Sequence, residues 1–140
     1  MKLRPVLLSL LLPALCSCGP ESAEAQVKKA FETCVKAVES GEAAPAVEAL
    51  AKDFSGPEGM GRDEAKLFLL GILSREKVGV TVLSSRIEIQ GSQAQQSVEL
   101  MLTGRKGSEL LPQEASKHIY LLRWEKQKGK WKLRELQESR

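Results

Sequence analysis

Apolar residues recur every three or four positions over residues 21–40. Val27, Phe31 and Val38 belong to one such stripe, which predicts an amphipathic helix over 21–40. Ser22 stands where a helix N-cap belongs, because its hydroxyl can accept a hydrogen bond from the first turn. The pattern therefore predicts an early helix that buries one face.

Two further helices are predicted after it. Residues 44–54 repeat apolar positions at helical spacing and predict a short second helix that ends at Asp53-Phe54. Three glycines and one proline within 55–61 predict a loop. Residues 62–74 predict a third helix, and its segment 67–73 is apolar on most sides. We therefore expect the third helix to be covered on both faces.

From residue 78 the apolar period changes from about 3.6 to 2, which predicts a strand over 78–90. Gly91-Ser92 suits a two-residue hairpin turn into a second strand. A change of phase near 83–85 indicates a bulge or bend. The register predicted from the turn pairs Gln90 with Gln93, Ile89 with Ala94, Ser85 with Val98, Leu83 with Leu100 and Thr81 with Leu102.

A second hairpin is predicted near the end of the chain, with strands over 117–126 and 130–136 joined by a turn at Lys128-Gly129. Its register places Trp124 opposite Leu133, Lys126 opposite Trp131, and Glu125 opposite Lys132 as an ion pair. Helices first and antiparallel strands afterwards predict an α+β domain, with three helices packed on a curved antiparallel sheet of about four strands. The predicted shared core contains Phe31, Val35, Leu50, Phe54, Leu70, Leu83, Leu100, Leu122 and Trp124.

This order of elements resembles the nuclear transport factor 2-like superfamily. The features that carry the resemblance are the helix around Val27–Val38, the short second helix, and the closing hairpin Leu122–Leu133 with its Trp-x6-Trp spacing and glycine turn. The resemblance covers about 23–136 and implies a cone with a cavity between the helices and the sheet. A ketosteroid-isomerase-like member would need a Tyr on the first helix, where this chain offers Phe31. No catalytic residue carries over.

The first residues are typical of a secretory signal peptide, with a basic start and an apolar run too short to span a bilayer. Leu15-Cys16-Ser17-Cys18 resembles the end of a bacterial lipoprotein signal, which implies lipid attachment at Cys18. The predicted organisation is a signal over 1–17, a lipidated tether over 18–22 and the cone domain over 23–140. The alternative is an ordinary signal peptide, after which Cys18 and Cys34 would be free to pair.

Gly19 follows the lipidated position, and in such lipoproteins a residue other than Asp there favours the outer membrane. We therefore expect a lipid anchor in the cell envelope, facing the periplasm. Removing the segment before Cys18 takes away Lys2 and Arg4 and lowers the formal charge from +3 to +1, with 19 Lys and Arg against 18 Asp and Glu. Since the basic hairpin strands also carry interspersed glutamates, we predict no nucleic-acid partner.

The inventory of reactive side chains is small. One His and two Asp exclude a multi-histidine metal site and make a carboxylate dyad hard to build. We therefore predict no metal and no cofactor. His118 is a candidate general base, Glu99 a candidate acid and Cys34 a candidate thiol. For each of them a structural or surface role fits the pattern better.

The sequence therefore predicts a non-catalytic envelope lipoprotein that binds a small apolar ligand or an envelope protein through its cone. The alternatives are a small isomerase, dehydratase or cyclase acting on a hydrophobic substrate, and an interaction module with a filled core. The candidate pocket residues are Phe31, Phe54, Tyr120 and Trp124, with the Tyr120 hydroxyl as the polar handle. A homodimer is a further candidate, because members of the resembled family often dimerise through the sheet.

Overall fold

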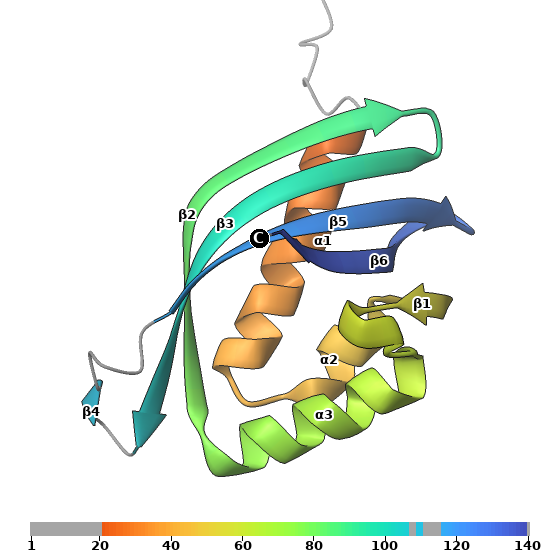
Figure 1. Ribbon diagram of the computed structural model, residues 1–140. Coiled ribbons are helices and arrows are strands. Elements are labelled where there is room, and N and C mark those ends of the chain that lie inside the picture. The colour runs from red at the N-terminus through yellow and green to blue at the C-terminus, as the bar shows by residue number, and fades with distance from the viewer. Residues whose placement is uncertain (1–20, 107–108, 111–115, 140) are drawn as a thin grey trace, which may run out of the picture.

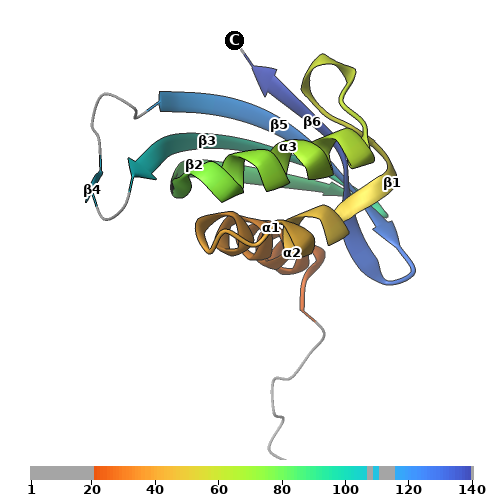
Figure 2. The same ribbon diagram turned by 90° about the horizontal axis from the view of Figure 1, so that it is seen from below.

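The computed structural model describes residues 21–106, 109–110 and 116–139. Three helices gather on the concave side of one curved sheet (Figures 1 and 2), which confirms the predicted α+β fold class. The helices are α1 (Ala23–Glu39), α2 (Ala43–Glu48) and α3 (Arg62–Arg75), with a short 3-10 turn at Pro57–Gly59. The strands are β1 (Leu50–Ser55), β2 (Lys77–Gln90), β3 (Gln93–Lys106), β4 (Glu109–Leu110), β5 (Ser116–Gln127) and β6 (Lys130–Ser139).

The sheet has five main strands in the order β1-β6-β5-β3-β2, and β4 adds two residues beside β3. All neighbours are antiparallel except β1, which runs parallel to β6. The expectation of about four antiparallel strands was therefore short by one strand, and the sheet is mixed. The extra strand comes from the segment 50–55.

Residues 50–54 were predicted to form the end of the second helix, and this prediction is wrong. The helix α2 ends at Glu48, and Leu50 pairs with Leu133 of β6. The main-chain N–H of Leu133 donates to the carbonyl of Ala49 at 2.8 Å. A six-residue segment with three apolar residues fits a helix or a strand by pattern. Here the open edge of β6 decides the outcome because it offers main-chain hydrogen-bond partners.

The first helix forms as its sequence predicts. The Ser22 hydroxyl accepts a hydrogen bond from the Ala25 N–H at 3.1 Å, which confirms the N-cap. At the other end Gly41 has a φ of +76°, and the N–H of Glu42 returns to the carbonyl of Ala37 at 2.8 Å. Between these caps Val27 and Phe31 are buried against the sheet.

The first hairpin follows the predicted register only as far as its bulge. Gln90 pairs with Gln93, and Ser85 pairs with Val98, as expected. Between Val82 and Ser84 the register shifts by one residue, so the partners of Leu100 and Leu102 are Val82 and Val80 instead of Leu83 and Thr81. The extra residue turns Leu83 outward, where 47% of it is exposed. Leu83 is therefore not a core residue, and β2 bends at about this point (Figure 1).

The third helix is present, but only one of its faces is covered. Ala65 is buried, whereas Leu67, Phe68 and Leu70 expose 71%, 55% and 48% of their surface. The helix α3 lies beside α2 at one rim of the cone (Figure 1). The predicted burial of both faces, and of Leu70 in the core, is wrong because no described element packs on the outer side of α3.

The second hairpin has the predicted turn, and its register is as predicted from the turn to Trp124, beyond which it shifts by one residue so that Arg123 pairs with Glu135. Lys128 and Gly129 both have positive φ, as a tight turn of this kind requires. Trp124 pairs with Leu133 and Lys126 with Trp131. The predicted ion pair differs, since Glu125 binds Arg134 at 3.1 Å while the Lys132 ammonium donates to the Glu48 carbonyl at 2.7 Å.

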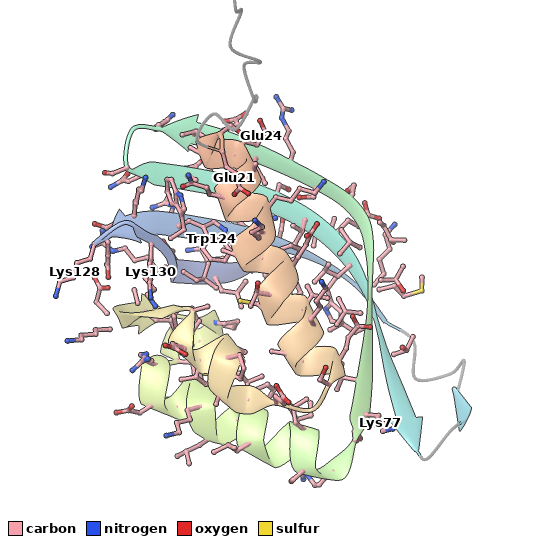
Figure 3. All side chains as sticks on the ribbon, turned by 180° about the vertical axis from the view of Figure 1, so that it is seen from behind. Glu21, Glu24, Lys77, Trp124, Lys128 and Lys130 are labelled. Carbon is pink, nitrogen blue, oxygen red and sulfur yellow. The ribbon has the colours of Figure 1, made fainter. Side chains whose placement is uncertain are left out.

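The core lies between α1 and the sheet, and Trp124 is at its centre (Figure 3). Trp124 is 1% exposed, and its indole N–H donates to Gln96 Oε1 at 2.9 Å. The Gln96 amide, itself 1% exposed, donates in turn to the Ser85 hydroxyl at 3.1 Å. The buried core residues are Val27, Phe31, Leu50, Phe54, Ala65, Ala94, Val98, Leu100, Leu122, Trp124, Trp131 and Leu133, and Val35 packs against them.

Candidate functional site

An apolar cavity of about 200 Å³ lies between α1 and the concave face of the sheet. Its walls come from the second half of α1 and from the inner faces of β2, β3, β5 and β6. The side chains that line it are Phe31, Cys34, Val35, Val38, Val80, Val98, Leu100, Leu102, Tyr120, Leu122, Trp124, Leu133 and Leu136. All of them are aliphatic, aromatic or thiol side chains, as expected of a site that prefers apolar molecules.

The cavity is closed at one end of the strands and open at the other. Val98 and Trp124 at the closed end are 1% exposed. Val80, Leu102 and Tyr120 are only half-buried, and Val80 pairs directly with Leu102 across β2 and β3. The opening therefore lies where β2 begins and β3 ends. Lys77 marks this end of the sheet in Figure 3, whereas Glu21 and Glu24 mark the opposite end of α1.

Three polar side chains meet at the open end. Tyr120, His118 and Glu138 occupy inner-face positions of β5 and β6, since Tyr120 pairs with both Val98 and Glu138. The rings of His118 and Tyr120 are stacked, with centroids 5.7 Å apart and planes 19° apart. His118 Nδ1 lies 2.6 Å from Glu138 Oε1, so the imidazole N–H donates to the carboxylate. The result is a polar rim beside an apolar wall.

The pKa of Tyr120 reflects this position. Burial raises the pKa of the phenol above its ordinary value, and the negative charge of Glu138 raises it further. The hydroxyl is therefore protonated at neutral pH and is a hydrogen-bond donor.

The four candidate pocket residues do not all lie in one place. Phe31, Tyr120 and Trp124 line the cavity. Phe54 is buried in the core but is not part of this lining, because β1 holds it beside Gly56. Cys18, the candidate lipid-attachment residue, lies outside the described residues.

The other candidate reactive groups are placed differently. Glu99 is on the outer face of β3 and forms an ion pair with Lys117, away from the cavity. Cys34 lines the cavity wall, and burial raises the pKa of its thiol to about 11, which nearby Lys132 only partly offsets. At neutral pH this thiol is protonated and acts as part of the apolar wall.

The sequence did not reveal Glu138 as part of the site. The last strand was expected to end near Leu136, whereas β6 continues to Ser139. Continuing the predicted register beyond Trp124 and Leu133 would have paired Tyr120 with Gln137, and a register shift of one residue between Arg123 and Trp124 brings Glu138 opposite Tyr120 instead. The sequence signal for a strand is weak at residues 137–139, because all three are polar and lack the alternation of apolar residues.

A larger hollow of about 390 Å³ lies at the outer face of the sheet, near the ends of both hairpins. Its two arginines are already paired: Arg123 with Glu135 at 3.5 Å, and Arg134 with Glu125 at 3.1 Å and Asp53 at 3.2 Å. Because these ion pairs satisfy its charges, the smaller apolar cavity is the better candidate for a ligand site.

Over the described ranges 21–106, 109–110 and 116–139, no three His, Cys, Asp or Glu side chains converge as metal ligands. The helices of the same ranges include none that is long and apolar enough to cross a bilayer.

No protein-family model matches the chain, and no curated protein matches it by sequence. Solved structures do resemble it. An NTF2-like protein from Cytophaga hutchinsonii ATCC 33406 superposes with a TM-score of 0.70 at 15% identity, covering 85% of this chain and 98% of that one. A protein of unknown function with a cystatin-like fold from Nostoc punctiforme PCC 73102 gives 0.68 at 14% identity, covering 82% and 88%.

A third structure, an NTF2-like protein with a cystatin-like fold from Novosphingobium aromaticivorans, superposes with a TM-score of 0.67 at 9% identity and covers 82% of this chain and 79% of that one. At such low identities the likeness concerns the fold. The curved sheet, the three helices on its concave side and these superpositions lead to one conclusion: the chain has the nuclear transport factor 2-like, cystatin-like cone fold that its sequence predicts.

Proposed function

We propose that this protein is a lipid-anchored protein of the cell envelope whose cone binds a small apolar molecule. The observation that carries the proposal is the cavity of about 200 Å³ with apolar walls on α1 and four strands. Apolar cavities of roughly 150 Å³ in other proteins stay dry and take up one benzene-sized molecule. A cavity of this size therefore suits a single ring or a short branched chain, and excludes a sterol or a long acyl chain in full.

Filling the cavity should abolish this binding. Val38 lines the open half of the cavity on α1, so Val38→Phe places a ring where the ligand would lie. We expect toluene to bind the wild-type chain, and to bind this variant at least about tenfold more weakly. Amide chemical-shift titration by NMR measures both affinities and shows whether cavity residues respond.

Leu121→Phe is the matched control, because Leu121 is 46% exposed on the outer face of β5 and does not line the cavity. It should change the toluene affinity by less than about twofold, as a surface substitution does. Wild-type protein whose cavity residues do not respond to saturating toluene would contradict the proposal.

The proposed anchor is a lipid on Cys18. Only three residues lie between Cys18 and Ser22, which caps α1 at the closed end of the cone. An anchor there would turn the opening of the cavity away from the bilayer, toward the aqueous compartment. The ligand would then be exchanged with the periplasm or with an envelope protein rather than drawn directly from the membrane.

Detergent phase partitioning of the protein expressed in a Gram-negative bacterium measures the anchor. The wild type should enter the detergent phase, and Cys18→Ala should move almost entirely to the aqueous phase because the thiol that accepts the lipid is lost. Cys16→Ala keeps a small residue at its position of the signal and should partition like the wild type. Equal partitioning of Cys18→Ala and wild type would rule out this anchor.

One observation favours a second candidate function, proton transfer on a small hydrophobic substrate. The carboxylate–imidazole pair Glu138–His118 lies beside Tyr120 at the opening of the cavity, and such pairs act as general bases. If the cone is an isomerase or dehydratase, it should catalyse deuterium uptake next to the carbonyl of cyclohexanone in D2O, and His118→Gln should remove most of that activity. Exchange at the buffer rate would leave ligand binding as the function.

A further inference from the structure

The outer side of α3 carries apolar side chains that no described part of the chain covers. Leu67, Phe68 and Leu70 expose 71%, 55% and 48% of their surface, and no other large apolar side chain in the described ranges is as exposed. Figure 2 looks onto this side of the helix, and no other element lies in front of it. Because exposed apolar side chains grouped in this way mark interaction sites, we expect α3 to have a partner.

Charges of opposite sign stand at the two ends of this surface. The spacing i, i+4, i+7 and i+11 places Glu64, Phe68, Gly71 and Arg75 in one row along α3. Glu64 and Arg75 are about 16 Å apart along the helix axis, too far to pair within one chain. Neither forms an ion pair with any other described residue. Arg75 Nε donates to the Gly71 carbonyl at 3.1 Å, so its terminal nitrogens can still donate to a carboxylate.

This row of side chains is complementary to a second copy of itself that runs in the opposite direction. When two α3 helices lie antiparallel and cross between residues 69 and 70, Glu64 of one copy is opposite Arg75 of the other. Phe68 is then opposite Gly71. Each of these contacts occurs twice, because such a pair has twofold symmetry. The second copy therefore supplies both the counter-charges and the apolar cover that the single chain lacks.

Gly71 supports the same arrangement. A Cβ atom at this position would meet only a terminal nitrogen of Arg75, at an ordinary contact distance of 3.9 Å. The packing of the single chain therefore does not require a glycine here, although glycine destabilises the interior of a helix relative to alanine. In the antiparallel pair the missing side chain leaves room for the Phe68 ring of the other copy.

We propose that α3 is the interface of a homodimer, in which two copies of the helix pack antiparallel through this row. The outer face of the sheet suits a second copy less well, because its exposed apolar side chains are interspersed with the ion pairs Glu99–Lys117 and Arg123–Glu135. A bilayer is not the partner that we propose, since α3 lies at the opposite end of the molecule from the start of α1, where the proposed lipid would be (Figure 1).

Two helices of 14 residues bury a small interface, so we expect the dimer to dissociate reversibly in the micromolar range. Sedimentation velocity of the full, unlipidated chain over a series of concentrations up to about 1 mM measures this equilibrium. The dimer does not depend on a ligand in the cavity, so its failure would leave the proposed function standing.

Charge reversal tests the pairing of Glu64 with Arg75. Glu64→Arg should weaken dimerisation at least about tenfold, because two positive charges then face each other at both ends of the interface. Arg75→Glu should weaken it to a similar extent, because it opposes two negative charges. An equimolar mixture of the two variants should form a heterodimer about as stable as the wild-type dimer, since every reversed charge then meets an opposite one.

Substitution of Phe68 tests the apolar part of the interface. Phe68→Ser should also weaken the dimer at least about tenfold, because it removes the ring that packs over Gly71. Leu121→Ser is the matched control, since Leu121 is 46% exposed on the outer face of the sheet. It should change the dissociation constant by less than about twofold.

Several outcomes would overturn this inference. A wild-type chain that stays monomeric up to about 1 mM has no such interface. Equal association of the wild type and Phe68→Ser would place the contact outside α3, and a larger effect of Leu121→Ser would place it on the sheet. A mixture of the two charge variants that does not restore the dimer would rule out the antiparallel pairing. A monomer that binds phosphatidylglycerol vesicles, and loses this binding with Phe68→Ser, would show that the face contacts lipid instead.

Discussion

Replacing Trp124 by Ala should lower the free energy of unfolding by about 3–5 kcal/mol, the range for large aromatic side chains removed from a core. Trp124 is 1% exposed, lies at the middle of the core and forms part of the closed end of the cavity. Its loss would leave a hole that the rigid strands β3, β5 and β6 cannot fill, and would also leave Gln96 Oε1 without its donor. Urea denaturation followed by circular dichroism measures the change.

Two neighbouring leucines provide the control for this experiment. Leu122 is buried on the inner face of β5, whereas Leu121 points outward with 46% of its surface exposed. Leu122→Ala should cost about 2–5 kcal/mol, and Leu121→Ala should stay within roughly 0.5–1 kcal/mol. A cost below about 1 kcal/mol for Trp124→Ala, or equal costs for the two leucines, would show that the register of the last hairpin is wrong.

Replacing Gln96 by Leu should cost about 1–3 kcal/mol, although the new side chain is apolar and of similar size. The reason is that the indole N–H of Trp124, which donates to Gln96 Oε1 at 2.9 Å, would remain buried without an acceptor. If only the burial of apolar surface mattered, Gln96→Leu would instead raise the free energy of unfolding. Denaturation of the variant in urea therefore tests whether the hydrogen bond, rather than the packing volume, sets the cost.

A double-mutant cycle isolates this hydrogen bond. In a Trp124→Phe background no indole N–H loses its acceptor, so Gln96→Leu should then leave the free energy of unfolding nearly unchanged. The two changes should therefore couple by about 1–2 kcal/mol. Gln95→Leu is the matched control on the neighbouring, exposed position of β3. It should have an effect within roughly 0.5 kcal/mol in either background. The same cost for Gln96→Leu with Trp and with Phe at position 124 would disprove the role of this bond.

The two stability predictions bear on function, because Trp124 lines the cavity and Gln96 is hydrogen-bonded to Trp124. Trp124 and Val98 close its deep end, while half-buried residues at the ends of the strands leave the other end open. A stable closed end explains how the walls can remain in place around a space that no side chain fills. The binding variant Val38→Phe acts at the open half, where it should alter affinity more than stability.

Local signals in the sequence determined the helix α1 and both hairpins. Ser22 and Gly41 cap α1 through hydrogen bonds that span only a few residues. Gly91 and the pair Lys128-Gly129 adopt the positive φ that tight turns need, and each turn sets the register of the strands beside it. These features were predictable because residues close in sequence decide them. Their order along the chain was also enough to predict the fold class.

Contacts between distant segments decided the rest. Residues 50–55 form a strand because the edge of β6 offers main-chain partners some 80 residues later in the chain. One extra residue at the bulge before Ser84 reverses which side chains of β2 face the core, and so turns Leu83 outward. The apolar face of α3 stays exposed because nothing described packs on it. The periodicity of a sequence indicates which residues can be buried, but it does not indicate which other element packs against them.

The same division holds for the site. Phe31, Tyr120 and Trp124 could be placed on the concave face from the sequence, because alternation along a strand and the stripe of a helix assign their faces. Phe54 lies outside the cavity because β1 joins the sheet. Glu138 meets His118 and Tyr120 because β6 extends to Ser139 and because its register with β5 shifts by one residue beyond Trp124. The open space between α1 and the sheet is itself a tertiary property, since it depends on how far apart the curvature of the sheet holds side chains that are distant in the sequence.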